Sequence, residues 1–325
     1  MTAYSILDLV PVREGGTLAE AFADATELAR AAEAMGCKRF WVAEHHAMEG
    51  IAGGATSVVL AHIGNATSTI RIGSGGIMLP NHTPFQIAEQ FGTLDALFPG
   101  RVDLGLGRAP GAGPELQRAL RKDLHRAAEM FPQDVVELRA FMAGETAIHP
   151  TPGLGAAPEF WMLGSSLFGA QLAAKLGMPY AFASHFAPDQ LDSALDVYRR
   201  TFEPSPACPA PHVMVAMNLF CADTPEEAET LATSQLQAFV ALRTGAPSKL
   251  KPPVPGYRES LPPAAQAMLA HIGQASAIGT PEQCAEAVRG FVARTGADEV
   301  IFAGPTFDPA QRIRSLERVM AQLGG

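Results

Sequence analysis

The sequence predicts an α/β protein of the closed (β/α)8 type, a TIM barrel. Apolar segments of strand length alternate with amphipathic helical segments along the chain, and polar residues gather where the strands end. No Gly-x-Gly-x-x-Gly motif follows the first strand, which argues against an open dinucleotide-binding sheet. With 325 residues, 47% of them hydrophobic, the chain can bury the core of one barrel. We therefore expect a single domain over residues 1–325.

The first half of the chain predicts four strands and three helices. The expected strands cover residues 4–10, 39–44, 71–79 and 101–107, and the helices cover 17–36, 56–67 and 84–97. Thr17 and Glu20 form a capping box, in which each side chain satisfies a free amide of the first turn. Thr83 opens the third helix in the same way, with proline at the first helical position. The apolar faces are expected to comprise Leu18, Phe22, Ala25, Leu28, Ala32 and Met35 on the first helix, and Ile87, Phe91, Leu94 and Leu97 on the third.

The second half repeats this alternation. Strands are expected at residues 160–163, 179–183, 212–221 and 298–303, and helices at 166–176, 189–201, 225–244, 281–294 and 309–322. Thr224 and Thr280 each begin a further capping box followed by proline. Together the two halves supply the eight strands of a closed barrel.

Residues 245–275, called the lid segment below, depart from the pattern. The segment carries prolines at 247, 252, 253, 255, 262 and 263, too many for a barrel element. Long loops in compact domains are usually functional or disordered. We expect an active-site lid, and a solvated insertion is the alternative.

Charge and composition exclude several classes of partner. The formal net charge is −9 with only 24 Lys and Arg, so a nucleic-acid partner is not expected. The chain shows neither a signal-peptide pattern nor an apolar run approaching the roughly 18 residues of a membrane span, so no membrane contact is expected. The four cysteines, Cys37, Cys208, Cys221 and Cys284, are scattered and suit apolar filler. A cytoplasmic protein with reduced thiols fits this pattern.

Chemically active side chains follow five of the predicted strands. In a parallel barrel the carboxyl ends of the strands meet at one mouth, so these loops should converge. They contain Glu44-His45-His46, Asn81-His82, Arg108, Gly164-Ser165-Ser166 and Ser184-His185.

Two of these loops predict proton transfer. A neutral histidine can accept or donate a proton near pH 7, and Glu44 beside His45 could hold its tautomer. The alternative is a pair of hydrogen-bonded core histidines, and His82 could equally be a turn residue.

Two other features predict a ligand with a phosphate and a flat ring. Arg108 could clamp an anion, and Gly164, Ser165 and Ser166 stand where a strand gives way to a helix start. An ordinary serine cap is the alternative there. The pair Gly75-Gly76 interrupts an apolar strand, which indicates a bulge, close approach of a ligand, or simply relief of crowding.

Several motifs in fixed order resemble the bacterial luciferase-like flavin-dependent monooxygenases, especially their single-component oxidoreductase branch. The resemblance covers nearly the whole chain. It is carried by residues 7–12, 41–46, 72–80, 99–111, 182–186 and 279–284.

The resemblance implies a (β/α)8 barrel that uses reduced FMN and oxygen to oxidise a small organic substrate. NAD(P)H would be the ultimate reductant, with a separate flavin reductase as a possible partner, and a homodimer would form through helices flanking the second and third strands. By motif, His45 matches the family's catalytic histidine, and Gly75-Gly76 matches a pair joined by a cis peptide behind the flavin. Arg108 and Ser165 match phosphate contacts.

Three departures from the family stand out. The chain has Gly107 where luciferases carry a reactive cysteine, and Gly164 where they carry an acidic residue. Light emission is therefore not implied. Leu167-Phe168 stands where close relatives often have aspartate and tyrosine.

These inferences combine into one expected site. FMN would place its phosphate near Arg108, Ser165 and Ser166, its ring against Gly75-Gly76, and its reactive edge toward His45 and His185. Glu44 would orient His45, and no metal is expected.

Two alternatives to this site stay open. One is a metal-dependent barrel hydrolase using Glu44, His45, His46, Asp103 and His185, although adjacent strand residues face opposite sides. The other is a deazaflavin-dependent or non-oxygenase flavin-binding member of the same superfamily.

Overall fold

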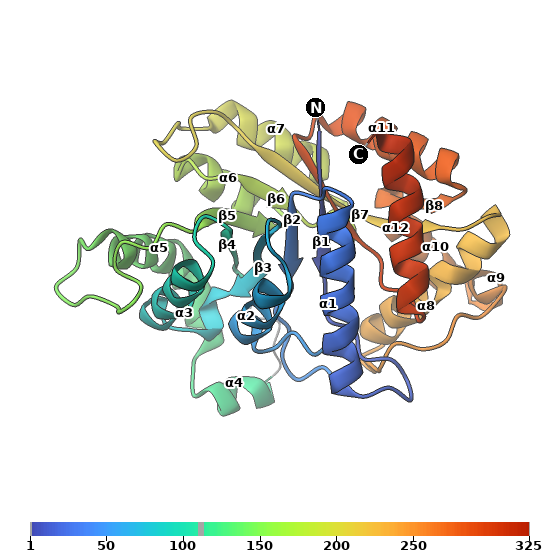
Figure 1. Ribbon diagram of the computed structural model, residues 1–325, viewed down its shortest axis with the longest axis horizontal. Coiled ribbons are helices and arrows are strands. Elements are labelled where there is room, and N and C mark those ends of the chain that lie inside the picture. Colours follow the sequence, from blue (N-terminus) through green and yellow to red (C-terminus); the bar gives the residue numbers. More distant parts are fainter. Residues whose placement is uncertain (1, 110–113, 325) are drawn as a thin grey trace.

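The computed structural model describes residues 2–109 and 114–324, and these form a closed barrel of eight parallel strands (Figure 1). The predicted TIM-barrel fold is confirmed. Around the barrel each strand pairs with the next and the last returns to the first. In that order the strands are β1 (Ala3–Asp8), β2 (Arg39–Val42), β3 (Arg71–Met78), β4 (Val102–Gly107), β5 (Glu159–Gly164), β6 (Tyr180–Phe182), β7 (Val213–Cys221) and β9 (Glu299–Ala303).

A ninth strand, β8 (Ser276–Gly279), was not expected. The long β7 pairs with β9 through Met214–Asn218 and then with β8 through Asn218–Cys221. β7 therefore reaches past the barrel wall and carries a short strand outside it.

The predicted helices form the outer layer (Figure 1). They are α1 (Leu18–Ala34), α2 (Thr56–Ala66), α3 (Pro84–Leu97), α6 (Leu167–Lys175), α7 (Leu191–Thr201), α8 (Pro225–Arg243), α11 (Pro281–Thr295) and α12 (Pro309–Leu323). Thr17, Thr224 and Thr280 make complete capping boxes, and Thr83 accepts a bond from the amide of Gln86.

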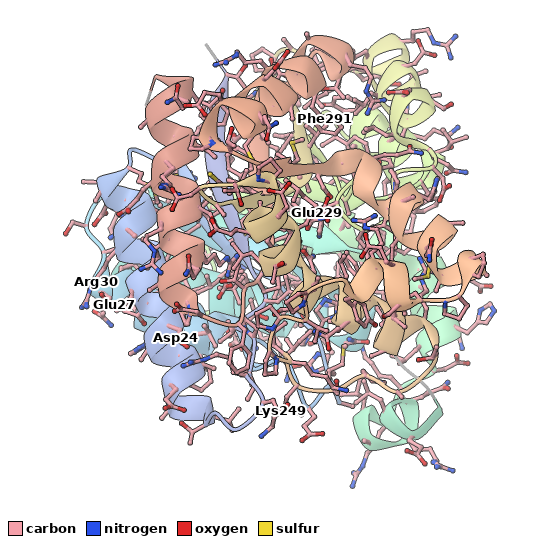
Figure 2. The ribbon with its side chains drawn as sticks, turned by 90° about the vertical axis from the view of Figure 1, so that its right-hand side faces the viewer. Asp24, Glu27, Arg30, Glu229, Lys249 and Phe291 are labelled. Carbon is pink, nitrogen blue, oxygen red and sulfur yellow. The ribbon has the colours of Figure 1, made fainter. Side chains whose placement is uncertain are left out.

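The outer helices expose some residues that were expected in the core. Leu18 and Leu97 are 58% and 57% exposed, because both lie in terminal turns that extend past the surface their helices cover. The solvent face of α1 carries the ion pair of Glu27 and Arg30, with 2.6 Å between Oε1 and Nη1 (Figure 2).

Between β4 and β5 the chain forms two helices that the sequence did not predict, α4 (Pro114–Leu120) and α5 (Leu124–Ala143). Asp123 caps α5 by accepting bonds from the amides of His125 and Arg126. Pro132 lies inside α5 and hides its periodicity, since proline usually ends a helix.

The lid segment is more ordered than expected. It contains α9 (Tyr257–Ser260), α10 (Pro263–Ile272) and a 3₁₀ turn, η2 (Gly273–Ala275). Pro262 and Pro263 stand at the start of α10, where a missing amide costs little. Leu250 is 4% exposed and bonds through its backbone to Val12 and Glu14 in the loop after β1. The segment is tied to a loop of the barrel mouth at Leu250, although residues 251–256 are exposed, so the lid and the solvated insertion both stay open as predictions.

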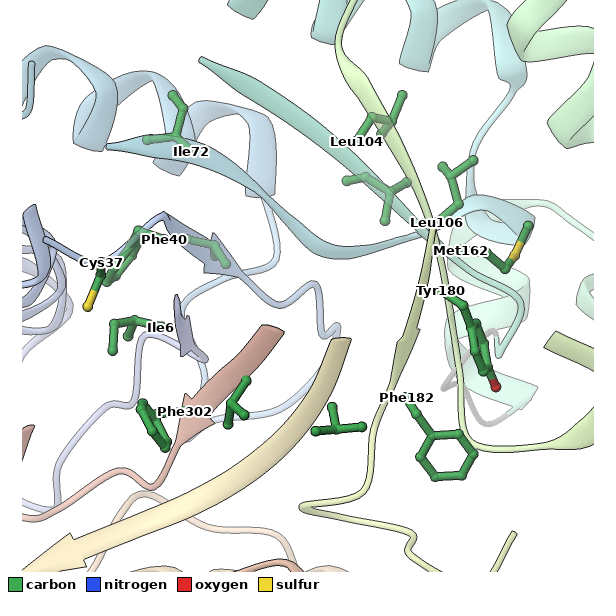
Figure 3. Packing of buried hydrophobic residues seen from close by; sticks show 14 of the residues in the cluster. Ile6, Cys37, Phe40, Ile72, Leu104, Leu106, Met162, Tyr180, Phe182 and Phe302 are labelled. Carbon is green, nitrogen blue, oxygen red and sulfur yellow. The ribbon is translucent and has the colours of Figure 1, made fainter. Parts of the chain in front are cut away.

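Strand residues alternate between two apolar layers. Ile6, Phe40, Ile72, Leu104 and Phe302 belong to the layer between strands and helices (Figure 3). The other layer fills the barrel interior and consists of Leu7, Trp41, Ala43, Trp161, Ala181, Met214, Ala216, Ile301 and Ala303.

A buried ion network closes the amino end of the barrel. Arg39, fully buried on β2, donates to Asp103 at 2.8 Å and to Glu299 at 2.9 Å, and Trp41 Nε1 donates to Asp103 at 2.9 Å. In the part of the chain that the structure describes, this end is filled by paired charges and two tryptophans, which leaves the opposite, carboxyl end as the expected way in for a ligand. Among the described residues, no helix is long and apolar enough to cross a membrane.

Candidate functional site

Glu44, which follows β2 at the barrel mouth, organises two histidines. Its carboxylate is 2% exposed, and Oε1 accepts bonds from His46 Nε2 at 2.5 Å and His82 Nε2 at 2.7 Å. Oε2 accepts a bond from the amide of Met78 at 3.0 Å. Burial raises the pKa of Glu44, but the bonds from the two histidines outweigh it and lower the pKa to about 2. The carboxylate is thus held ionised. Its hydrogen bond with His46 also raises the pKa of His46.

Glu44 was expected to orient His45, but its carboxylate hydrogen-bonds His46 and His82 instead, since the loop after β3 brings His82 toward it. Glu44 acts on His45 through its charge, which raises the pKa of His45 against the effect of burial. His82 is therefore more than the turn residue that the sequence allowed.

His45 and His185 are a second, neutral pair. Burial lowers the pKa of His45, and burial together with the nearby charge of a protonated His45 lowers the pKa of His185 to about 4. Nδ1 of His185 is buried and has no hydrogen-bond partner within the described part of the chain. Near pH 7 both imidazoles are neutral, so each has one nitrogen to donate and one to accept.

A polar chain that the sequence analysis missed holds the loop of His185. Asn218 donates through Nδ2 to the carbonyl of His185 at 2.9 Å, and Gln235 Nε2 donates to Asn218 Oδ1 at 2.9 Å. Ser184 donates to the carbonyl of Ala216 at 2.6 Å. The sequence could have indicated a role for Asn218, because it is the one amide side chain in the otherwise apolar β7.

The residues of the hydrolase alternative are not brought together. Asp103 lies at the amino end, where Arg39 and Arg71 bind it, whereas Glu44 is at the mouth. The donor atoms of Glu44, His46 and His82 do lie within 4.8 Å of one another and could hold a metal ion. In this structure Nε2 of each histidine is instead hydrogen-bonded to Glu44 Oε1.

Gly75 and Gly76 are joined by a cis peptide, as the resemblance implied. The β3–β4 register shifts between Ser74 and Ile77, which marks an irregularity at this pair. A Cβ on Gly76 would lie 2.7 Å from the carbonyl oxygen of Gly105, and one on Gly75 would lie 2.6 Å from Leu7 Cδ1. Crowding against backbone therefore requires glycine at 76, whereas at 75 the neighbour is the end of a flexible side chain. Both residues are half-buried, so part of this peptide stays open to the mouth.

The structure brings Arg108 to the start of α6. Arg108 follows β4, is exposed, and places its guanidinium carbon 4.0 Å from the ring centroid of Phe168 in the first turn of α6. Gly164 ends β5, Ser165 is exposed, and Ser166 stands at the N-cap without using its side chain as a cap. The ordinary serine cap is therefore wrong. A cation, two hydroxyls and a helix N-terminus together form a site that suits a phosphate.

Phe168 and Gln190 are further residues of this site that sequence reasoning did not assign. Phe168 supports the guanidinium of Arg108, and Gln190 Oε1 accepts the bond from the amide of Leu167 at 3.1 Å. Phe168 could have been proposed from the sequence, because it is an aromatic residue two positions after Ser166. Gln190 could not, because its contact with α6 depends on how the loop after β6 folds.

The fold and the mouth define a class of protein: a (β/α)8 barrel whose ionisable and hydroxyl side chains gather at the carboxyl ends of its strands. The family model for luciferase-like monooxygenases matches residues 2–299, and the chain belongs to this family.

Curated relatives agree with this assignment. A luciferase-like monooxygenase of Escherichia coli (strain K12) is 45% identical over 321 residues, which cover 98% of this chain and 96% of the relative. An N-acetyl-S-alkylcysteine monooxygenase of Bacillus subtilis (strain 168) is 36% identical over 253 residues, 75% of each chain.

Solved structures share the fold. Apo-MsnO8 superposes with a TM-score of 0.88 at 31% identity, covering 100% of this chain and 99% of that one. The oxygenating constituent of 3,6-diketocamphane monooxygenase from Pseudomonas putida, in complex with FMN, gives 0.72 at 19% identity, covering 99% and 98%. An F420-dependent secondary alcohol dehydrogenase in complex with an F420-acetone adduct gives 0.71 at 17% identity, covering 99% of each chain.

Proposed function

We propose that this chain is a flavin-dependent monooxygenase that uses reduced FMN and oxygen to oxidise a small organic substrate. The observation that carries the proposal is the contact between the guanidinium of Arg108 and the ring of Phe168, in the first turn of α6. Family membership supports oxygenase chemistry, and the FMN complex of the 3,6-diketocamphane enzyme supports the choice of cofactor for a barrel of this shape.

The described residues fit such a cofactor at two places. Arg108, Ser165 and Ser166 would hold the phosphate, with the amides at the start of α6 adding partial positive charge. The half-buried peptide of Gly75-Gly76 would lie against the ring, since no side chain can stand at position 76. Gly164 leaves room beside the phosphate, because a Cβ there would meet only ordinary contacts at 3.5 Å or more.

Reduced flavin supplies the electrons that activate oxygen when it is bound. The chain's own part is proton handling and exclusion of water. His45 would donate or accept the proton at the reacting atoms, and the unpartnered Nδ1 of His185 would contact the ring or the substrate. Glu44 would act as a positioning residue through His46 and His82. The lid segment, tied to the loop after β1, would restrict water at the mouth.

The second candidate is a deazaflavin-dependent oxidoreductase, which the shared fold of the F420-dependent alcohol dehydrogenase favours.

The proposal for the FMN-dependent monooxygenase has four further parts: NAD(P)H as the ultimate reductant, a separate flavin reductase, a homodimer and a cytoplasmic location.

Calorimetric titration with oxidised FMN, with reduced FMN under anaerobic conditions, and with F420 tests the cofactor. We expect reduced FMN to bind, and Arg108→Ala to weaken it about tenfold, equivalent to roughly 1.4 kcal/mol. Arg30→Ala, on the solvent face of α1, is the matched control and should bind as the parent does. Binding of F420 alone would favour the second candidate, and binding of none of the three would overturn both.

Oxygenase activity is tested by supplying reduced FMN from a flavin reductase and NADPH in the presence of ¹⁸O₂. Organic sulfides and ketones are suitable first substrates, given the named activities of the relative and the structural neighbour. Incorporation of one labelled oxygen atom into product supports the proposal. Reduced-flavin binding with transfer of hydride but no label in any product would contradict the oxygenase step.

A further inference from the structure

Two of the four cysteines meet outside the barrel mouth. Cys221 is the last residue of β7, and Cys284 lies in the first turn of α11. β8 aligns Gly279 with Cys221, and Cys284 Sγ lies 3.6 Å from the carbonyl oxygens of both Gly279 and Phe220. Each thiol perturbs the pKa of the other. They are 63 positions apart in the sequence, so only the fold creates this pair.

The backbone around the pair is fixed on both sides. Ser315 of α12 accepts a bond from the amide of Cys221 at 3.2 Å and donates one to its carbonyl at 2.7 Å. The amide of Cys284 donates to Thr280 at 2.9 Å. The thiols can therefore approach each other by side-chain rotation, with the surrounding backbone held in place.

The two thiols differ in access. Cys221 lines a cavity of about 610 Å³ together with residues of α8 and α12, among them Thr230, Arg314 and Arg318. Cys221 is 3% exposed, and Cys284, which does not line the cavity, is fully buried. A small molecule entering this cavity would meet the sulfur of Cys221 first.

The two thiols also differ in acidity. The interaction with Cys284 and the charge of Arg318 lower the pKa of Cys221 against burial and the charges of Glu282 and Asp223, the latter being the ion-pair partner of Arg318. The interaction with Cys221 and burial raise the pKa of Cys284. The remaining cysteines are inert by comparison, because burial raises the pKa of Cys37 to about 12 and also raises that of Cys208. A thiolate beside a thiol of higher pKa matches an attacking and a resolving cysteine.

We propose that Cys221 and Cys284 form a hydroperoxide-reactive dithiol, with Cys221 as the attacking sulfur and Cys284 as the resolving one. The Cys221 thiolate attacks one oxygen of hydrogen peroxide, the O–O bond breaks, and hydroxide leaves to take up a proton as water. Cys221 becomes a sulfenic acid. The Cys284 sulfur then attacks it, forming the S–S bond and releasing a second water. Two electrons pass from the sulfurs to the peroxide, and a dithiol reductant reverses the change.

This inference does not depend on the proposed function, since the peroxide can be added to the protein in the absence of any flavin. It changes the interpretation of the four cysteines as equivalent apolar filler. The fold separates one reactive pair from two isolated thiols.

The test uses the full-length protein, purified reduced and treated with one equivalent of hydrogen peroxide before alkylation in denaturant. Peptide mapping without reductant should recover a Cys221–Cys284 cross-linked peptide, with the intact mass lower by two hydrogen atoms and both other thiols alkylated. Cross-linking should be independent of protein concentration and reversed by dithiothreitol. Cys221 should react at least about tenfold faster than Cys37.

Variants separate the two roles. In Cys284→Ser, oxidation should stop at a sulfenic acid on Cys221 that a cyclic 1,3-dione traps, and in Cys221→Ser the cross-link should vanish. Cys37→Ser is the matched control and should oxidise as the parent does. Equal oxidation of all four thiols, a cross-link between molecules only, or no reaction at Cys221 would each overturn the proposal. The mapping of the unsubstituted protein decides this even if a variant folds poorly.

Discussion

Glu44 Oε1 lies 2.7 Å from His82 Nε2, so a carboxylate at the end of β2 holds a histidine that follows β3. His46 binds the same oxygen, which ties two loops of the barrel mouth together through one buried charge. The catalytic candidate His45 is next to this network in the sequence, whereas the hydrogen bonds of Glu44 Oε1 go to His46 and His82. The loop that carries His45 is thus fixed by its neighbours on both sides.

Removing the charge of Glu44 should change the pH dependence of the enzyme. In Glu44→Gln the raised pKa of His46 should fall toward its ordinary value of about 6.5, because its bond to the carboxylate is the main cause of the shift. We expect turnover to drop about tenfold or more, with a displaced pH profile. Glu49→Gln, an exposed neighbour, is the control. An unchanged profile in Glu44→Gln would show that the network is structural only.

Acid should destabilise the protein through the same residue. The pKa of Glu44 is lower in the folded state, about 2, than its ordinary value of 4.5, so its contribution is fully present above pH 4.5 and is lost as the pH falls toward 2. The full loss, reached below pH 2, is roughly 3 kcal/mol of unfolding free energy, and about 2 kcal/mol of it falls between pH 6 and 3. Urea denaturation across that range measures this part. The same series on Glu44→Gln should show a shallower fall.

His45→Asn should separate catalysis from binding. A general acid or base contributes about 10² to 10⁴ in rate, so kcat should fall by that factor while reduced FMN binds as in the parent. His62→Asn, on the exposed face of α2, should leave both values unchanged. Parent-like turnover in His45→Asn would remove His45 from the mechanism. Because burial lowers the pKa values of both His45 and His185, activity should be retained through neutral pH and decline as the pH falls toward 4.

Gly76→Ala should damage both stability and cofactor binding. The new Cβ would stand 2.7 Å from the carbonyl oxygen of Gly105, and backbone of β4 cannot move away cheaply. We expect a loss of about 1 to 3 kcal/mol in thermal or urea unfolding. Gly290→Ala is the matched control, because its Cβ meets nothing within 4 Å inside α11, and it should stabilise by roughly 0.5 to 1 kcal/mol. If Gly76→Ala unfolds like the parent, the strand is less crowded than described.

Arg39→Met should destabilise the amino end of the barrel. It leaves the buried carboxylates of Asp103 and Glu299 without their shared cation, which typically costs about 3 to 5 kcal/mol. Arg294→Ala removes an exposed pair with Asp192 and should cost less than about 1 kcal/mol. Equal effects of the two changes in urea unfolding would contradict the role given to the buried network.

Much of the barrel could be predicted from the sequence because its signals are local. Capping boxes at Thr17, Thr224 and Thr280 fix helix starts within four residues, and apolar strands end directly in polar loops. The failures have physical reasons as well. Pro132 masks α5, and β8 is too short to show a period of its own.

The sequence by itself determined the fold class, the loops that meet at the mouth and the glycine pair on β3, since periodicity and turn chemistry act over a few residues. Only the tertiary structure decided the partners of individual side chains. In the folded chain Glu44 hydrogen-bonds His46 and His82, and the guanidinium of Arg108 lies over the ring of Phe168. Asp103 lies at the opposite end of the barrel, and Cys221 lies beside Cys284. These choices depend on strand register and on loops from distant parts of the chain, because a shift of one residue turns a side chain to the other face of its strand.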